Sequence, residues 1–142
     1  MIVGDGKFKF ELDQNWPITI PEYWSLGQCA DIDIDLDDNA WVFSRGKHPV
    51  TKWSNDGNFL GSWGNQGDQK GEFRIPHGLN IDSEGFIWLT DHQTHQVTKH
   101  KSDGECVLEL GEFGFANFTL TTDGTQGNPF NCLLYTSPSP RD

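Results

Sequence analysis

The sequence predicts an all-β fold built from repeated four-stranded units, and three observations support this prediction. Among its 142 residues are 16 glycines and six tryptophans, which are typical of tight turns and of strands with aromatic faces. Acidic and apolar residues alternate through residues 31–36, with the two-residue period of a strand instead of the 3.6-residue period of a helix. The third observation is an internal repeat.

The repeat aligns residues 28–67 with residues 75–114 at an offset of 47. Eleven of the forty ungapped positions are identical, whereas unrelated segments would share roughly two or three. A period of about 40 to 50 residues with four strands is typical of a β-propeller blade. We therefore expect a partial β-propeller of about two blades. The identities include Ile34-Asp35 with Ile81-Asp82, Trp41 with Trp88, Val50-Thr51-Lys52 with Val97-Thr98-Lys99, and Asp56-Gly57 with Asp103-Gly104.

Each segment has an expected place in this arrangement. Residues 1–27 are expected to form one leading outer strand, at residues 7–12, and a linker. The first blade is expected at residues 28–67, with strands at about 30–36, 40–43, 50–53 and 59–63, and the second blade at residues 68–114. Residues 115–131 are expected to link into a truncated third blade. The ending, residues 132–142, resembles translated adaptor sequence, so we expect an artefact there and a longer natural protein that closes as a ring.

Composition narrows the classes of partner. Ten basic and 21 acidic residues give a net charge of -11, which disfavours nucleic acid because like charges repel the phosphate backbone. Three cysteines without a CxxC spacing do not make a disulfide framework. No export signal and no apolar run of about 18 residues is present in the sequence, so we expect a soluble protein without a membrane partner, in a compartment that the sequence does not indicate.

The repeat separates packing residues from site residues, because what every blade needs for packing recurs. His48 and His95 are equivalent, so we interpret both as structural. His77 stands opposite Ala30 at the expected start of the innermost strand, which lines the central channel of a propeller. A histidine there is a candidate metal ligand, and the alternatives are a structural loop histidine or a nonspecific polar lining of the channel.

Arg45 is the second residue that breaks the repeat, because His92 stands at its equivalent position. Its planar fork of donors suits a carboxylate or a carbonyl oxygen. An exposed turn arginine is the alternative. The sequence has no nucleophile elbow and no phosphate-binding glycine loop, so it gives no support to serine-based acyl transfer or nucleotide binding.

Two motifs carry a family resemblance. The stretch Arg74–Asp82, continued by Ile87–Asp91 and His95–Val97, resembles an early blade of the peptidyl-hydroxyglycine amidating lyases, and Ile34–Asn39 followed by Val42–His48 resembles the arginine-bearing motif of the same family. The resemblance covers about residues 4 to 131, on an NHL-repeat pattern that many noncatalytic propellers share.

The resemblance implies a fold, an activity and a set of site residues. The family folds as a six-bladed NHL propeller and cleaves a peptidyl-α-hydroxyglycine, a small peptide substrate, into a peptide amide and glyoxylate. It implies Arg45 as the active-site arginine, His77 as a zinc ligand, and the backbone carbonyls of Ile32 and Leu79 as ligands of a structural calcium. Two more zinc histidines and a tyrosine base belong to later blades, so we expect this fragment alone to be inactive.

Two other functions stay open at this point. A noncatalytic NHL propeller that binds a protein or peptide would explain the repeat equally well. A calcium-dependent hydrolase of the gluconolactonase type has a related motif, but His77 stands where that family has an amide side chain.

Overall fold

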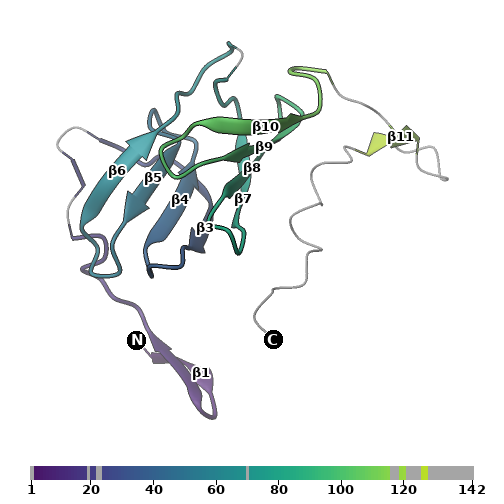
Figure 1. Ribbon diagram of the computed structural model, residues 1–142. Helices are drawn as coiled ribbons and strands as arrows, with labels where there is room; N and C mark the ends of the chain where they lie inside the picture. Colours follow the sequence, from purple (N-terminus) through teal and green to yellow (C-terminus); the bar gives the residue numbers. More distant parts are fainter. Residues whose placement is uncertain are drawn as a thin grey trace.

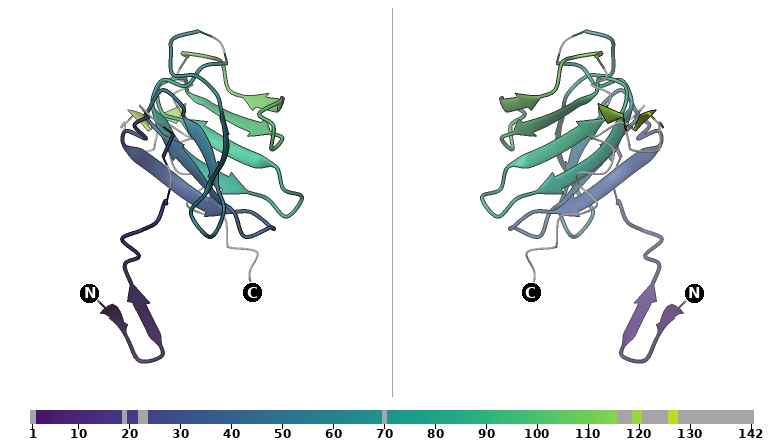
Figure 2. Two further views of the ribbon diagram at one scale, coloured as in Figure 1. Left: turned by 90° about the vertical axis from the view of Figure 1, so that its left-hand side faces the viewer. Right: turned by 90° about the vertical axis from the view of Figure 1, so that its right-hand side faces the viewer.

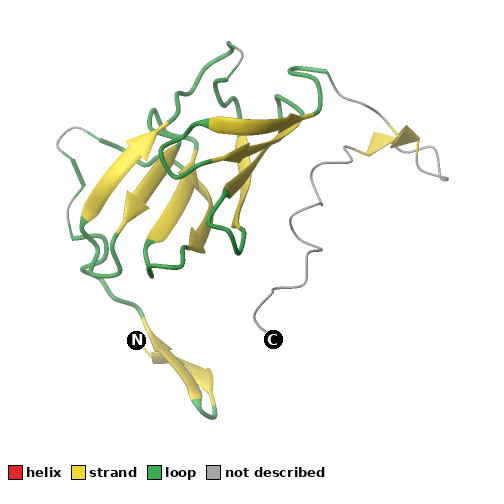
Figure 3. Ribbon diagram, in the orientation of Figure 1, coloured by secondary structure: helices red, strands yellow, loops and turns green. Residues whose placement is uncertain are grey.

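A computed structural model describes residues 2–18, 20–21, 24–69 and 71–115, together with the backbone of residues 119–120 and 126–127. The described residues form strands and turns, with no helix among them, which confirms the all-β prediction (Figure 3). No segment of this part of the chain is a helix long and apolar enough to cross a membrane. The strands are β1 (Ile2–Asp5), β2 (Phe8–Glu11), β3 (Cys29–Ile34), β4 (Ala40–Ser44), β5 (Val50–Trp53), β6 (Phe59–Trp63), β7 (Pro76–Ile81), β8 (Ile87–Asp91), β9 (Gln96–His100), β10 (Cys106–Leu110), β11 (Thr119–Leu120) and β12 (Gln126–Gly127).

Two four-stranded antiparallel sheets make up the body of the molecule, in the orders β3-β4-β5-β6 and β7-β8-β9-β10 (Figure 1). Each sheet is a meander in which every strand pairs with the next one along the chain. This is the architecture of two propeller blades, blade 1 and blade 2. The four strands expected in the first repeat are confirmed, with ends that differ by at most two residues.

The Asp-Gly pairs of the repeat form the hairpin turns that the sequence predicts. Gly57 and Gly104 have φ angles of 85° and 93°, a left-handed conformation that glycine adopts without steric cost. A Cβ atom on Gly104 would also lie 2.8 Å from the Trp63 ring of blade 1. This turn of blade 2 therefore needs glycine both for its conformation and for its contact with the neighbouring blade.

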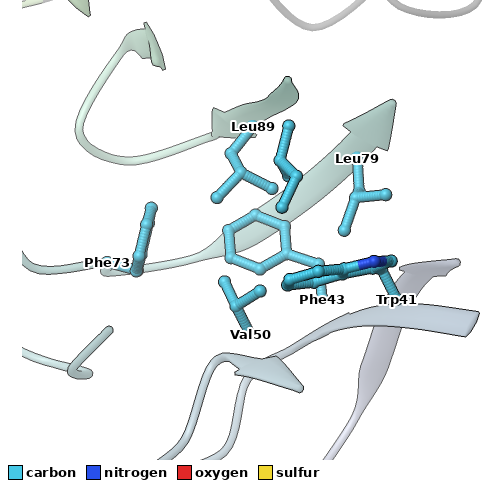
Figure 4. Packing of buried hydrophobic residues seen from close by; sticks show 7 residues of the cluster. Trp41, Phe43, Val50, Phe73, Leu79 and Leu89 are labelled. Carbon is cyan, nitrogen blue, oxygen red and sulfur yellow. The ribbon is translucent and has the colours of Figure 1, made fainter. Parts of the chain in front are cut away.

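The core lies between the two sheets (Figure 4). Trp41, Phe43 and Val50 of blade 1 face Leu79 and other apolar residues of blade 2, and all of them are less than 9% exposed. Period two explains the pattern, because successive residues of β4 point to opposite faces of the sheet. The side chains on the other face of β4 form a second cluster with Trp53. Residues 16 and 26 of the preceding segment pack against this cluster.

A polar triad recurs in both blades and accounts for several identities of the repeat. Trp41 Nε1 donates to Asp35 Oδ2 at 2.9 Å, and Lys52 Nζ lies 2.9 Å from the same oxygen. Forty-seven residues further on, Trp88 Nε1 donates to Asp82 Oδ2 at 2.8 Å, and Lys99 Nζ lies 3.1 Å from it. The two tryptophans differ in burial, since Trp41 belongs to the core cluster and Trp88 is only half-buried.

The triads keep both carboxylates charged. Burial alone would raise the pKa of Asp35, but hydrogen bonds from Trp41, from the Asn39 backbone and from Lys52 outweigh it and hold this pKa well below its ordinary value. In Asp82, too, burial opposes the shift, and hydrogen bonds from Trp88, the Phe86 backbone and Lys99 lower the pKa. The charged form of each carboxyl is thus the one that the fold stabilises.

The N-terminal segment corrects one prediction. The expected single outer strand at residues 7–12 is instead the second half of a hairpin, because β2 pairs antiparallel with β1. Gly6, with a φ of 59°, makes the turn between them. The hairpin extends away from the two sheets (Figure 2), and its Phe8 and Phe10 are 64% and 63% exposed. Apart from Phe115 and the short strands β11 and β12, the linker expected at 115–131 and the tail expected at 132–142 lie outside the described residues.

Candidate active site

The inner strands of the two blades, β3 and β7, lie side by side and are joined by carboxylates. Leu79 N donates to Asp31 Oδ2 at 2.9 Å, and Ile81 N donates to Asp33 Oδ2 at 2.7 Å. The alternation of acidic residues along β3 therefore has a structural purpose, because it satisfies backbone donors at the free edge of the neighbouring blade. These bonds set the position of β7, and with it that of His77, relative to blade 1.

Arg45 directly follows β4 and reaches across to blade 2. Its Nε donates to the Pro76 carbonyl at 3.2 Å and its Nη1 donates to Gln28 Oε1 at 3.1 Å. Its backbone N–H also donates to the Gln28 carbonyl at 2.9 Å. The guanidinium is thus held beside the residue that immediately precedes His77.

His77 is the second residue of β7 and is half-buried. Its ring lies nearly parallel to that of His92, with the centroids 6.5 Å apart and an interplanar angle of 18°. An open pocket of about 440 Å³ lies next to it. The pocket is lined by Gln28, Cys29, Ala30, Arg45 and His77.

The structure therefore brings together the two residues that the repeat singled out, Arg45 and His77, in one pocket. Sequence reasoning missed Gln28, the side-chain partner of Arg45, and Cys29, an exposed free cysteine that also lines the pocket. The signal for Gln28 was present in the repeat, because its equivalent in blade 2 is Ile75. The structural interpretation of His48 agrees with its stacking on Trp24, at 3.6 Å between ring centroids.

Ile32 and Leu79 are equivalent residues of the two inner strands. The N–H of Ile32 donates to Asp31 Oδ1 at 2.9 Å, and that of Leu79 donates to Asp31 Oδ2. Both N–H groups therefore point away from the next strand of their own sheet. The N–H and C=O of an extended residue point to the same side, so the two carbonyl oxygens face the inner edge, where a cation could reach them.

The curated proteins to which this chain is similar have the names of the family that its motifs resemble. No family model matches the chain. Peptidylglycine alpha-amidating monooxygenase of Rattus norvegicus is 29% identical over 126 residues, which cover 72% of this chain and 13% of that protein. Peptidyl-alpha-hydroxyglycine alpha-amidating lyase 1 of Drosophila melanogaster is 46% identical over 46 residues, which cover 30% of this chain and 8% of that protein. This chain is a homologue of the peptidylglycine amidating proteins.

This homologue of the amidating proteins spans only a small part of its relatives, 13% and 8% of the two proteins named above. Among solved structures, virginiamycin B lyase from Staphylococcus aureus matches with a TM-score of 0.44 and 18% identity, over 67% of this chain and 32% of that chain.

Proposed function

We propose that this chain supplies two blades of a metal-dependent lyase that cleaves a peptidyl-α-hydroxyglycine into a peptide amide and glyoxylate. The observation that carries the proposal is the shared pocket of Arg45 and His77, two residues that the blade repeat does not require for packing. The homology to a peptidyl-alpha-hydroxyglycine alpha-amidating lyase supports the same reaction.

His77 is a suitable donor for zinc, because an imidazole nitrogen is a ligand that zinc accepts and this ring borders an open pocket. In the described part of the chain, no group of three or more His, Cys, Asp or Glu side chains could hold a metal ion. A catalytic zinc site takes three protein ligands and keeps one position open. We therefore assign the remaining ligands to other blades and expect the 142-residue chain alone to be inactive.

The residues of this chain would bind and orient the substrate. A zinc ion held by His77 and other ligands would supply Lewis-acid polarisation of a substrate oxygen. The Arg45 guanidinium would hold the substrate carboxylate and stabilise negative charge near the reacting carbon. The hydroxyl loses its proton to a base, its C–O bond becomes the aldehyde C=O of glyoxylate, the C–N bond breaks, and the amide nitrogen takes up a proton.

The proposal also includes a structural calcium ion bound between the two inner strands. The carbonyl oxygens of Ile32 and Leu79 are the kind of hard donor that calcium prefers, and both face the inner edge of the blades. Calcium takes six to eight oxygen ligands, so the other ligands would come from water or from further blades. Bound there, the ion would tie β3 to β7 beside the pocket.

The experiment is an assay of glyoxylate release by a complete propeller that carries these blades, supplied with a peptidyl-α-hydroxyglycine. We expect glyoxylate and peptide amide in equal amounts, loss of activity after chelation and its return with zinc. The 142-residue chain, assayed in parallel, should release none. Absence of glyoxylate from the complete propeller, or release that chelation leaves unchanged, would contradict the proposal.

A further inference from the structure

The backbone hydrogen bond that holds Arg45 has an equivalent in blade 2, although the side chains at the equivalent positions differ. Arg45 N donates to the Gln28 carbonyl at 2.9 Å, and His92 N donates to the Ile75 carbonyl at the same distance. The two bonds lie 47 residues apart, at the offset of the repeat. The backbone bond is therefore part of blade architecture, whereas the side-chain pair of Gln28 and Arg45 is specific to blade 1.

A hydrogen bond to Gln28 helps to orient the planar guanidinium of Arg45. A guanidinium has five N–H donors in a rigid plane. Within the described residues two of them are used, Nε–H by the Pro76 carbonyl and one Nη1–H by Gln28 Oε1. Two acceptors on one rigid plane set its orientation, so three N–H groups remain for a ligand in the pocket.

The lining of this pocket favours an anion. Arg45 contributes a cation, His77 an imidazole and Gln28 an amide, and no acidic side chain is among the five lining residues. A carboxylate matches the donor geometry of a guanidinium, because its two oxygens can accept two parallel N–H hydrogen bonds.

We propose that Gln28 is a positioning residue that holds the Arg45 guanidinium for the carboxylate of a small 2-hydroxy acid. The inference rests on the proposed function, since a peptidyl-α-hydroxyglycine ends in a 2-hydroxy carboxylate. It adds a residue of blade 1 that selects this end of the substrate.

The test is a titration of the 142-residue chain with glycolate, a 2-hydroxy carboxylate, and with glycolamide, its uncharged counterpart. Binding is followed by NMR through the Nε–Hε signal of Arg45 and, in every variant including Arg45→Gln, through the backbone amide signals of the pocket residues Cys29 and Ala30. The backbone amide spectra also confirm that each variant is folded. The variants are Gln28→Leu, which removes the acceptor, Gln28→Glu, which keeps an acceptor and adds a competing charge, and Arg45→Gln. Gln66→Leu is the matched control, because the Gln66 side chain contacts the backbone carbonyl of Arg45 instead of its guanidinium.

We expect glycolate, and not glycolamide, to shift the Arg45 signal of the wild-type chain and of Gln66→Leu. Gln28→Leu should weaken glycolate binding roughly three- to tenfold, because a charge-assisted hydrogen bond that orients the fork is lost. Gln28→Glu should weaken it more, although the glutamate still holds Arg45. If Gln28 served stability alone, the folded Gln28→Leu chain would bind glycolate as the wild-type chain does.

The outcomes separate the inference from the proposed function. If Arg45→Gln abolishes glycolate binding while Gln28→Leu and Gln28→Glu bind as the wild type does, the role of Gln28 is wrong and the Arg45 pocket stands. If Arg45→Gln also binds glycolate normally, or if the wild-type signal does not move, the pocket is not a carboxylate site and both fail.

Discussion

Two residues decide the candidate site, and they are recognised by what they do not share with their repeat equivalents. Arg45 stands where blade 2 has His92, and His77 stands where blade 1 has Ala30. The backbone N–H groups of Arg45 and His92 nevertheless make equivalent hydrogen bonds. In contrast, Asp35 and Asp82 recur because each one receives a tryptophan and a lysine in its own blade. A residue that recurs in both blades therefore indicates a packing role, and a polar residue that breaks the repeat indicates a candidate site.

Replacement of the triad carboxylate should destabilise the fold. In Asp35→Asn, the charged acceptor for Trp41 and Lys52 is lost, so we expect the free energy of unfolding to fall by about 1–3 kcal/mol. The exposed neighbour Asp37 serves as control, and Asp37→Asn should change stability by less than about 0.5 kcal/mol. Urea denaturation followed by tryptophan fluorescence measures both, and equal stabilities would contradict the account of the triad.

The same carboxylates predict a loss of stability in acid. The pKa values of Asp35 and Asp82 are lowered in the folded chain, so the unfolded state takes up protons first, at its pKa of about 3.9. Their contribution is therefore complete well above pH 4 and is lost progressively as the pH falls below it. Unfolding curves between pH 7 and pH 2 should show this fall, and the double variant Asp35→Asn and Asp82→Asn should show a shallower one.

At the scale of elements, the strands of the blades follow from the sequence, whereas the contacts between segments do not. Alternating residues and Asp-Gly turns predicted β3 to β6 to within two residues. The strand β1 was missed because Ile2-Val3-Gly4-Asp5 shows no alternation, and its partner β2 was therefore interpreted as a single strand. Gln28 was missed although it breaks the repeat, because an exposed glutamine in a loop has no motif of its own. Its contact with Arg45 became visible in the fold.

The packing of the two sheets should depend on Phe43. This side chain is fully buried between the blades and meets Phe73 edge to face, at 5.1 Å between ring centroids. Phe43→Ala should lower the free energy of unfolding by about 3–5 kcal/mol, because it leaves a cavity in the shared core. Phe8→Ala, in the exposed hairpin, is the control and should have little effect. Equal effects in thermal unfolding would contradict this assignment of the core.

At the scale of the whole molecule, the contacts that join the two blades and the carbonyls proposed for calcium lie on the same inner strands, β3 and β7. Asp31 and Asp33 accept backbone N–H groups from β7, and the carbonyls proposed for calcium lie on the same two strands. The repeat predicted that these strands face the channel of a propeller. The carboxylate bridges between them could not be predicted, because they depend on how one blade lies against the next.

These bridges should protect particular amides. In the double variant Asp31→Ala and Asp33→Ala, the acceptors of the Leu79 and Ile81 amides are removed, so hydrogen exchange at these two amides should accelerate. The Asn80 amide faces β8 in the ladder and should keep its protection, which makes it an internal control. Unchanged exchange at residues 79 and 81 would show that the bridges do not form in solution.

The central claim is that Arg45 and His77 act in one catalytic site, and the rate of glyoxylate release tests it most directly. In a complete propeller that carries these blades, Arg45→Gln and His77→Gln should each lower this rate by about 10²-fold or more, as the loss of a preorganised charge or of a metal ligand does. Lys47→Gln removes an exposed cation from the same loop and should leave the rate unchanged. If Arg45→Gln or His77→Gln releases glyoxylate as fast as Lys47→Gln, the assignment of the site is wrong.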